Sequence, residues 1–321
     1  MKKKISILSA CYNEEDNIYP LYEKIKEIME QLPQYEYEHL FADNCSTDNS
    51  ALIMKKIALE DRRVKVILNL RNFGPERSGT NLLLSTTGDA VVSMASDFQD
   101  PPEMIPAFLE AWEQGNKIVW GQRTGTKANP VMEVVRRIYY KVINLLSEAD
   151  EYERCTGFGI YDREVVDWIR WMNDPDPFVR NAVTALGYKP YLIPYEQQKR
   201  RAGKSKYNLR KYFDAAITSM IKTSRKPLRI ITYIGLLAAV FSSVAGIVYL
   251  ILKLIYWDSF DMGIAPIVIG FFLLTAIQMI CLGVIGEYVG VVLTNVKKVP
   301  LVVAKETINF EDGFVDDIEK K

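Results

Sequence analysis

The chain has 321 residues, and its 40 basic side chains balance its 40 acidic side chains. This neutrality gives no reason to expect a nucleic-acid partner, because nucleic-acid-binding domains carry a clear excess of basic residues. The four cysteines are far apart and the single histidine, His39, joins no cluster typical of a zinc site, so the cysteine pattern indicates a reducing compartment.

The first part of the chain alternates between short β-rich runs and helical patterns. Strands are predicted at residues 5–10, 38–42, 64–68 and 90–95. A polar or turn segment follows each strand, with helices expected at residues 18–32, 51–58, 76–86 and 106–114. Four strand-to-helix units in succession predict a parallel sheet covered by helices.

The fourth strand leads to a carboxylate, Asp97, and the prolines Pro101 and Pro102 prevent the strand ladder from continuing. In open α/β sheets, ligands bind beyond the carboxyl ends of the strands, which predicts that Asp97 lies beside a substrate phosphate or its metal ion. A single aspartate at a strand end can equally cap the next turn, so its role depends on the neighbouring motifs.

Two basic segments occur further along the chain. Residues 122–127 follow a predicted strand at 117–121, and this loop either holds a phosphate or is simply solvated. Residues 197–207 follow a predicted strand at 188–194 and place five basic side chains around Gly203. Because Ser205 and Tyr207 are interleaved with the charges, this second segment favours anion binding over a solvated surface.

Apolar residues gather in two long runs near the C-terminus, at residues 228–252 and 264–292. Each run exceeds the roughly 20 apolar residues that a membrane-spanning helix needs. The residues just before them, 207–227, have a basic amphipathic pattern typical of a helix on a bilayer surface. Lysines and arginines flank the hairpin outside its connecting loop, which predicts that both termini are cytoplasmic. Glu287 lies inside the second run, where a charged side chain is costly, so it needs either a polar partner or a position near the membrane–water interface.

Several motifs, taken in order along the chain, resemble the polyprenyl-phosphate glycosyltransferases. These are inverting family 2 glycosyltransferases similar to dolichol-phosphate mannose synthase and bactoprenol glucosyltransferase. The resemblance covers nearly the whole chain, and the matching segments are 12–15, 43–48, 72–74, 97–103, 200–207 and 285–290.

The resemblance implies an α/β architecture: a Rossmann-like glycosyltransferase A-type fold with a mixed, mainly parallel sheet, followed by an amphipathic interface helix and two transmembrane helices. The implied catalytic domain spans 1–206, the interface helix 207–227, the transmembrane hairpin 228–292 and a cytoplasmic tail 293–321. It also implies a homo-oligomer in the plasma membrane, with the catalytic domain in the cytoplasm.

The implied reaction moves a sugar from a UDP- or GDP-linked donor to the phosphate of a membrane polyprenol, with inversion. By the resemblance, Asp97 is the catalytic residue that holds Mg²⁺ or Mn²⁺ against the donor diphosphate. The implied donor-binding residues are Tyr12, Asn13, Glu14, Asp43 and Asn72. The implied residues that bind the acceptor phosphate are Arg200, Ser205 and Lys206.

The chain departs from the family pattern at two places that concern the chemistry. Ala95 stands where the family usually has the first aspartate of an Asp-x-Asp pair, and Gly157 stands where it usually has a proposed catalytic base. A divergent active enzyme would manage with Asp97 assisted by Asp100 or water, and Asp162 is a candidate replacement carboxylate. The alternatives are a degenerate protein that binds nucleotide sugar or polyprenyl phosphate without transfer, a non-enzymatic membrane adaptor, and a processive polysaccharide synthase.

Overall fold

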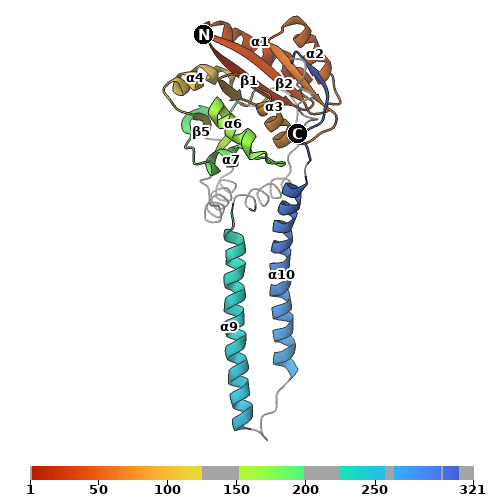
Figure 1. Ribbon diagram of the computed structural model, residues 1–321, viewed down its shortest axis with the longest axis vertical. Coiled ribbons are helices and arrows are strands. Elements are labelled where there is room, and N and C mark those ends of the chain that lie inside the picture. The colour runs from red at the N-terminus through yellow and green to blue at the C-terminus, as the bar shows by residue number, and fades with distance from the viewer. Residues whose placement is uncertain are drawn as a thin grey trace. The chain divides into compact units, whose positions relative to one another are not determined.

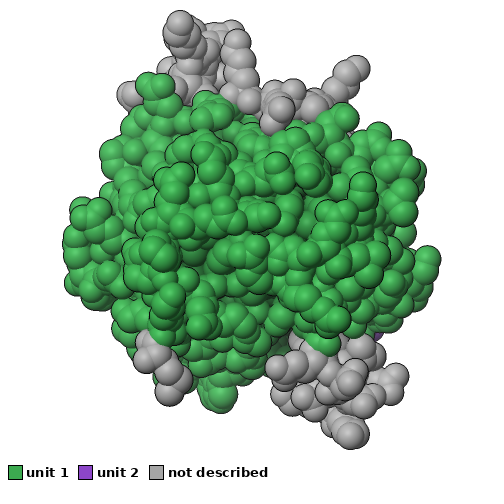
Figure 2. Space-filling view, turned by 90° about the horizontal axis from the view of Figure 1, so that it is seen from above, with its two compact units in different colours: residues 1–141, 150–209, 298–321 green, residues 142–149, 210–297 purple. Residues whose placement is uncertain are grey.

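The computed structural model describes residues 2–124, 152–198, 221, 224–256, 264–297 and 299–310, and the structural statements below concern these residues. The chain divides into two compact units, of which Figure 2 shows unit 1 in green. Unit 1 takes its residues from 1–141, 150–209 and 298–321, and unit 2 takes its residues from 142–149 and 210–297. Each unit is described by itself.

Unit 1 is built on an eight-stranded sheet in the order β7-β5-β6-β4-β1-β2-β3-β8. The strands are β1 (Lys3–Cys11), β2 (Tyr35–Asp43), β3 (Val64–Asn69), β4 (Ala90–Ser93), β5 (Ile118–Thr124), β6 (Cys155–Asp162), β7 (Tyr191–Glu196) and β8 (Ala304–Ile308). Parallel pairing joins β4 to β1, β1 to β2, β2 to β3, and β5 to β7. The contacts of β6 with β4 and β5, and of β8 with β3, are antiparallel. The sheet is therefore mixed and mainly parallel, as predicted.

Helices cover both faces of this sheet (Figure 1). The helices of unit 1 are α1 (Glu15–Glu30), α2 (Ser50–Glu60), α3 (Pro75–Leu84), α4 (Ile105–Glu113), α6 (Arg163–Met172) and α7 (Val179–Ala185). Residues of α1, α2 and α4 pack with Ile5 and Ile7 in one core cluster, whereas residues of α3, α6 and α7 pack with Leu8 in a second cluster. Alternate residues of β1 thus point into opposite cores, which explains why the central strands are apolar on both faces.

The carboxyl end of the sheet, where β1, β2, β3 and β4 finish, is also the end where β7 finishes and β8 begins. β7 runs in the direction of β4, because two antiparallel pairings separate β4 from β5 and β5 is parallel to β7. Its last residue, Glu196, is therefore at the carboxyl end. β8 is antiparallel to β3, with Ala304 opposite Asn69, so β8 begins at the same end.

The structure confirms the four predicted strand-to-helix units and adds elements that the pattern did not predict. β4 ends at Ser93, two residues before the predicted end. Helix α7 was not predicted, and strand β8 lies within the segment expected as a tail. The sequence pattern also predicts a helix at 131–149. This segment and most of the amphipathic helix predicted at 207–227 lie outside the described residues.

Unit 2 contains two long helices, α9 (Lys226–Ile255) and α10 (Ile264–Val296). Both are long and apolar enough to cross a membrane, with candidate spans at Lys226–Leu252 and Gly270–Val296. The hydroxyl of Tyr288 donates a 2.7 Å hydrogen bond to the carbonyl oxygen of Ser224, just before α9 begins. Glu287, the neighbour of Tyr288, is thereby level with the basic start of α9.

Candidate active site

The loops at the carboxyl end of the sheet carry most of the predicted site residues that the structure describes. Cys11 at the end of β1 pairs with Asp43 at the end of β2, and Asp43 pairs with Leu68 of β3. β4 ends on the other side of β1, where the backbone N–H of Met94 donates to the carbonyl oxygen of Leu8 (3.2 Å). These neighbouring strand ends bring together the loops that carry Tyr12, Asn13, Glu14, Asp43, Asn72 and Asp97.

Hydrogen bonds tie the loops after β1 and β2 to each other. The hydroxyl of Ser46 accepts from the backbone N–H of Asn13 (2.9 Å), and the backbone N–H of Ser46 donates to the carboxylate of Asp43 (3.1 and 3.3 Å). The side-chain oxygen of Asn13 accepts from the backbone N–H of Thr47 (2.8 Å). Glu14 is held in the same way, since its backbone N–H donates to the Ser50 hydroxyl (2.9 Å). Three of the predicted donor residues, Asn13, Glu14 and Asp43, thus belong to one hydrogen-bonded pair of loops.

A cluster of three asparagine amides shapes the next loop, after β3. The amide oxygen of Asn44 accepts from the side chain of Asn69 (3.1 Å) and from the backbone N–H of Phe73 (3.0 Å). Its amide nitrogen donates to Asn72 (3.1 Å) and to the carbonyl oxygen of Gly74 (3.1 Å). Asn72 therefore helps to hold the 70–74 loop against β2. The sequence motif identified Asn72, but nothing in it indicated this network.

Asp97 lies in a tight, buried loop beyond β4, with 6% of its surface exposed. One carboxylate oxygen accepts from the backbone N–H of Gln99 (3.1 Å), and the hydroxyl of Ser96 approaches the carbonyl oxygen of Ala10 (3.4 Å). Phe98 adopts a left-handed backbone conformation (φ 61°). That conformation costs a residue with a Cβ about 1–2 kcal/mol, and such strain concentrates at functional sites.

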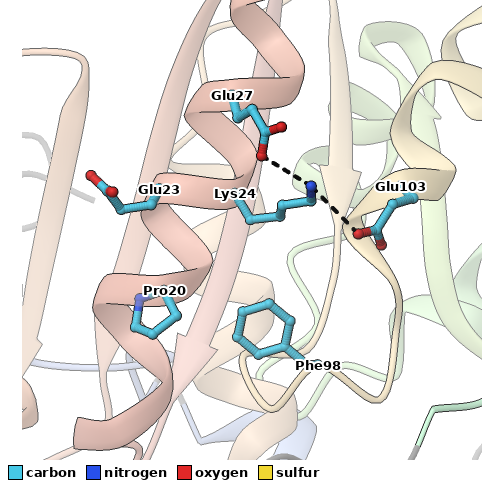
Figure 3. Close-up of a pocket in the computed structure, with 6 residues that line it drawn as sticks. All are labelled: Pro20, Glu23, Lys24, Glu27, Phe98 and Glu103. Atoms are coloured by element: carbon cyan, nitrogen blue, oxygen red, sulfur yellow. Dashed lines mark hydrogen bonds and ion pairs between the residues drawn. The ribbon is translucent and has the colours of Figure 1, made fainter.

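The ring of Phe98 fixes this strained loop to helix α1. It lines an open surface pocket together with Pro20, Glu23, Lys24, Glu27 and Glu103 (Figure 3). Lys24 forms ion pairs with Glu27 (3.0 Å) and Glu103 (3.8 Å) at this pocket. None of the predicted site residues lines the pocket, so it is not the expected donor site.

The partners of Asp100 compete with the role of second metal ligand suggested by the sequence. Its carboxylate accepts a 2.7 Å hydrogen bond from the Tyr195 hydroxyl, lies 3.5 Å from the Arg123 guanidinium, and faces the backbone N–H of Ala95 (3.4 Å). Burial raises the pKa of Asp100, whereas Tyr195 and Arg123 oppose that rise. Arg123 belongs to segment 122–127, which the sequence left as either a phosphate-binding loop or a solvated loop. These contacts place the Arg123 side chain in the cluster with Asp100 and Tyr195. Residues 125–127 lie outside the described residues.

Asp162 does not reach the carboxyl end of the sheet. It pairs with Ala90, the first residue of β4, and its carboxylate accepts from Trp112 (2.8 Å), Lys117 (3.0 Å) and the backbone N–H of Glu164 (3.1 Å). The prediction that Asp162 replaces the missing catalytic carboxylate is therefore wrong. The chain needs this carboxylate to cap α6, because the first N–H groups of a helix have no partner within the helix.

The two glycines of β6, Gly157 and Gly159, differ in the space around them. A Cβ at Gly159 would overlap the carbonyl oxygen of Val119 and would lie 2.9 Å from the Cα of Trp120. A Cβ at Gly157 would meet only the Tyr161 hydroxyl, at 3.2 Å, although φ is 87° there. The backbones of β5 and β6 thus approach each other in a way that requires glycine at position 159.

The described carboxylates suit a divalent ion whose other ligands are the phosphates of a bound substrate. Among the described residues, no group of three His, Cys, Asp or Glu side chains could hold a metal ion. Magnesium is commonly held by one or two carboxylates together with substrate phosphates. Asp97 suits that arrangement, whereas Asp100 is committed to Tyr195 and Arg123.

Residues 6–169 match the family model described as glycosyl transferase family 2. The chain belongs to glycosyl transferase family 2. It is 32% identical to a prophage bactoprenol glucosyl transferase homolog of Escherichia coli (strain K12), over 94% of this chain and 98% of that protein. It is 31% identical to the bactoprenol glucosyl transferase of Shigella phage SfX, over 92% and 97%. An uncharacterized glycosyltransferase of Bacillus subtilis (strain 168) is 32% identical over 96% and 95%.

One solved structure similar to this family 2 chain is the mannosyltransferase PcManGT from Pyrobaculum calidifontis in complex with GDP-Man and Mn²⁺. It superposes with a TM-score of 0.46 at 14% identity, over 92% of this chain and 87% of that chain. The family match identifies the protein as a glycosyltransferase with the A-type α/β fold. The predicted acceptor residues Arg200, Ser205 and Lys206 lie outside the described residues.

Proposed function

We propose that this glycosyltransferase moves one sugar from a UDP- or GDP-linked donor to polyprenyl phosphate, with inversion, at the cytoplasmic face of the plasma membrane. The observation that carries the proposal is the near full-length alignment with proteins named bactoprenol glucosyl transferase. The two candidate spans and the position of Asp97 beyond β4 support it.

In the proposed reaction, an oxygen of the polyprenyl phosphate attacks the anomeric carbon of the donor sugar. A carbon–oxygen bond forms there while the bond from that carbon to the nucleoside diphosphate breaks. A phosphate monoester is already an anion at neutral pH, so the acceptor needs positioning more than deprotonation. The absence of a carboxylate at Gly157 is compatible with that chemistry.

We assign roles in this reaction to the residues at the carboxyl end of the sheet. Tyr12, Asn13, Glu14, Asp43 and Asn72 would bind the donor, and Asp97 would hold Mg²⁺ or Mn²⁺. When bound, the ion would neutralise the diphosphate charge as the leaving group departs. Arg200, Ser205 and Lys206 would bind the acceptor phosphate, because guanidinium and ammonium groups form strong charge-assisted hydrogen bonds to it.

The test is mass spectrometry of the lipid fraction after the purified full chain is mixed with undecaprenyl phosphate, Mg²⁺ or Mn²⁺, and a panel of UDP- and GDP-sugars. We expect one product, a polyprenyl phosphate heavier by a single sugar. Asp97→Asn should abolish the product. Glu110→Gln, an equivalent change on the exposed surface of α4, should leave it intact. The oligomeric state of the same preparation, measured by light scattering, tests the expected homo-oligomer.

A second function is favoured by the two lost carboxylates at Ala95 and Gly157. In this alternative the protein binds nucleotide sugar or polyprenyl phosphate without transferring the sugar. Calorimetric binding of a donor to the full chain, with no lipid product under any condition, would establish the alternative and refute the transferase. A ladder of products with several sugars would instead indicate a processive synthase.

A further inference from the structure

Helix α6 carries an exposed aromatic surface on its second half. Trp171 exposes 77% of its surface, Trp168 exposes 45% and Met172 exposes 38%. The two indole rings contact each other edge to face, with their centroids 6.1 Å apart. Tryptophan brings a large apolar area and one N–H donor, so a pair left in water is costly unless something covers it.

The core of unit 1 does not need these side chains. α6 packs against the sheet through Val165, Val166 and Ile169, all of which are buried. Trp168 and Trp171 are three residues apart, so their side chains are neighbours on the helix surface, beside the buried stripe. The described part of unit 1 leaves this second apolar face exposed.

The aromatic face lies toward the carboxyl end of the sheet. α6 starts at the opposite end, where Arg163 donates to the carbonyl oxygen of Gly88 (2.7 Å), just before β4. Asp176, four residues beyond the end of α6, then reaches Arg77 in the first turn of α3 (3.4 Å). α3 starts from the loop at the carboxyl end of β3, so Trp171 and Met172 lie toward the end of the sheet where β7, the last strand before α9, finishes and where β8, the first strand after α10, begins.

The charges around the face are compatible with a lipid surface. Asp167 pairs with Arg170, and Asp176 pairs with Arg77. The carboxylate of Asp174 caps the turn after α6 by accepting from the backbone N–H of Asp176 (2.9 Å). Two of these three carboxylates are neutralised by arginines, so the contact depends on aromatic burial and not on attraction between charges.

We infer that Trp168, Trp171 and Met172 insert into the headgroup layer of the bilayer that α9 and α10 cross. The inference rests on the membrane location in the proposed function. Tryptophan is enriched where membrane meets water, because its ring is apolar and its N–H finds a polar partner there. The contact would hold the carboxyl end of the sheet close to the membrane, where a lipid-linked acceptor is found.

The experiment uses fluorescence quenching by lipids with brominated acyl chains. The full chain is reconstituted in phosphatidylcholine vesicles with and without bromine, in a Trp257→Phe background, because Trp257 lies in the connection between the two candidate spans. Of the remaining tryptophans, Trp112 and Trp120 expose only 8% and 0% of their surfaces. Brominated lipid should therefore quench mainly Trp168 and Trp171, and adding Trp168→Phe and Trp171→Phe should remove most of the quenching.

Quenching that persists after both exchanges, or no quenching at all, overturns the inference. Disulfide crosslinking of Trp171→Cys between two chains, without quenching of the parent, would also overturn it by assigning the face to a second copy. Sugar transfer is measured on the same vesicles, so the two proposals fail separately. Product without quenching refutes only the membrane contact, whereas quenching without product refutes only the transferase.

Discussion

The Tyr195 hydroxyl donates a 2.7 Å hydrogen bond to the carboxylate of Asp100, across 95 residues of sequence. The contact joins the end of β7 to the loop beyond β4, and Arg123 of β5 contacts both residues. Asp100 and Asp97 belong to the same loop beyond β4. We therefore expect the integrity of the cluster of Asp100, Arg123 and Tyr195 to determine both the stability of unit 1 and the position of Asp97.

Replacing Tyr195 by phenylalanine should destabilise the protein. The change removes the donor while Asp100 stays buried, and an unsatisfied buried polar group costs about 1–3 kcal/mol. Thermal unfolding of the full chain in detergent measures the loss as a lower Tm. Tyr191→Phe is the matched control, because Tyr191 lies in the same strand and is 50% exposed. Equal effects of the two changes would contradict the role of the hydrogen bond.

Restoring the family's first aspartate, with Ala95→Asp, should strengthen metal binding. Position 95 is only partly buried and lies two residues before Asp97, so a second carboxylate can reach the same ion. We expect the concentration of Mg²⁺ that gives half-maximal transfer to fall about tenfold, which corresponds to roughly 1.4 kcal/mol. Without metal, the added charge near Asp97 and Asp100 should lower Tm. An unchanged metal dependence would mean that Asp97 does not hold the ion.

The two glycines of β6 should respond differently to substitution by alanine. Gly159→Ala forces a methyl group into the backbone of β5 and should cost about 3 kcal/mol or more, seen as a large loss of Tm or of folded yield. Gly157→Ala meets only a hydroxyl, so its cost should stay near the roughly 1 kcal/mol of a left-handed residue. A reversed order would show that β5 and β6 are not as close as described.

The pH dependence of stability should contain a contribution from His39. Burial lowers its pKa to about 3, from an ordinary value near 6.5, with a small opposing effect of Asp61. As the pH falls below about 6.5, His39 becomes protonated in the unfolded chain but stays neutral in the folded chain. The free energy of unfolding therefore decreases as the pH decreases, by up to about 1.4 kcal/mol per pH unit. His39→Gln should flatten the dependence measured by unfolding between about pH 5 and pH 6.5. Parallel curves for both proteins would contradict it.

The sequence predicted the parts of the fold that depend on local pattern. The apolar runs of β1 to β4 and their helices follow from periodicity, and the strand ending near Asp97 indicated the carboxyl end of the sheet. The cluster of Asp100, Arg123 and Tyr195 could not be predicted in this way. It requires knowing that β5 and β7 are neighbours, and the partners are separated by 72 and 95 residues.

Two other features escaped prediction for different physical reasons. Asp162 looked like a spare carboxylate, but only the antiparallel direction of β6 shows that it lies at the wrong end of the sheet. Strand β8 is short and carries Lys305 and Glu306, the composition of an edge strand, whose outer side faces solvent. Such a segment has no strong alternation of apolar and polar residues, so its pairing with β3 is invisible in the sequence.

β8 follows the two long helices in the chain and forms the edge strand beside β3. The two helices are therefore inserted into the sequence of unit 1 and do not follow its last element. A single proteolytic cut between residues 199 and 223 would leave two fragments still joined by the pairing of β3 with β8. A fragment ending at residue 206 would lack β8 altogether and expose the free edge of β3, an apolar strand with unpaired backbone groups. Such truncated fragments should aggregate, and expressing residues 299–310 in trans or fusing them to the fragment should restore its solubility.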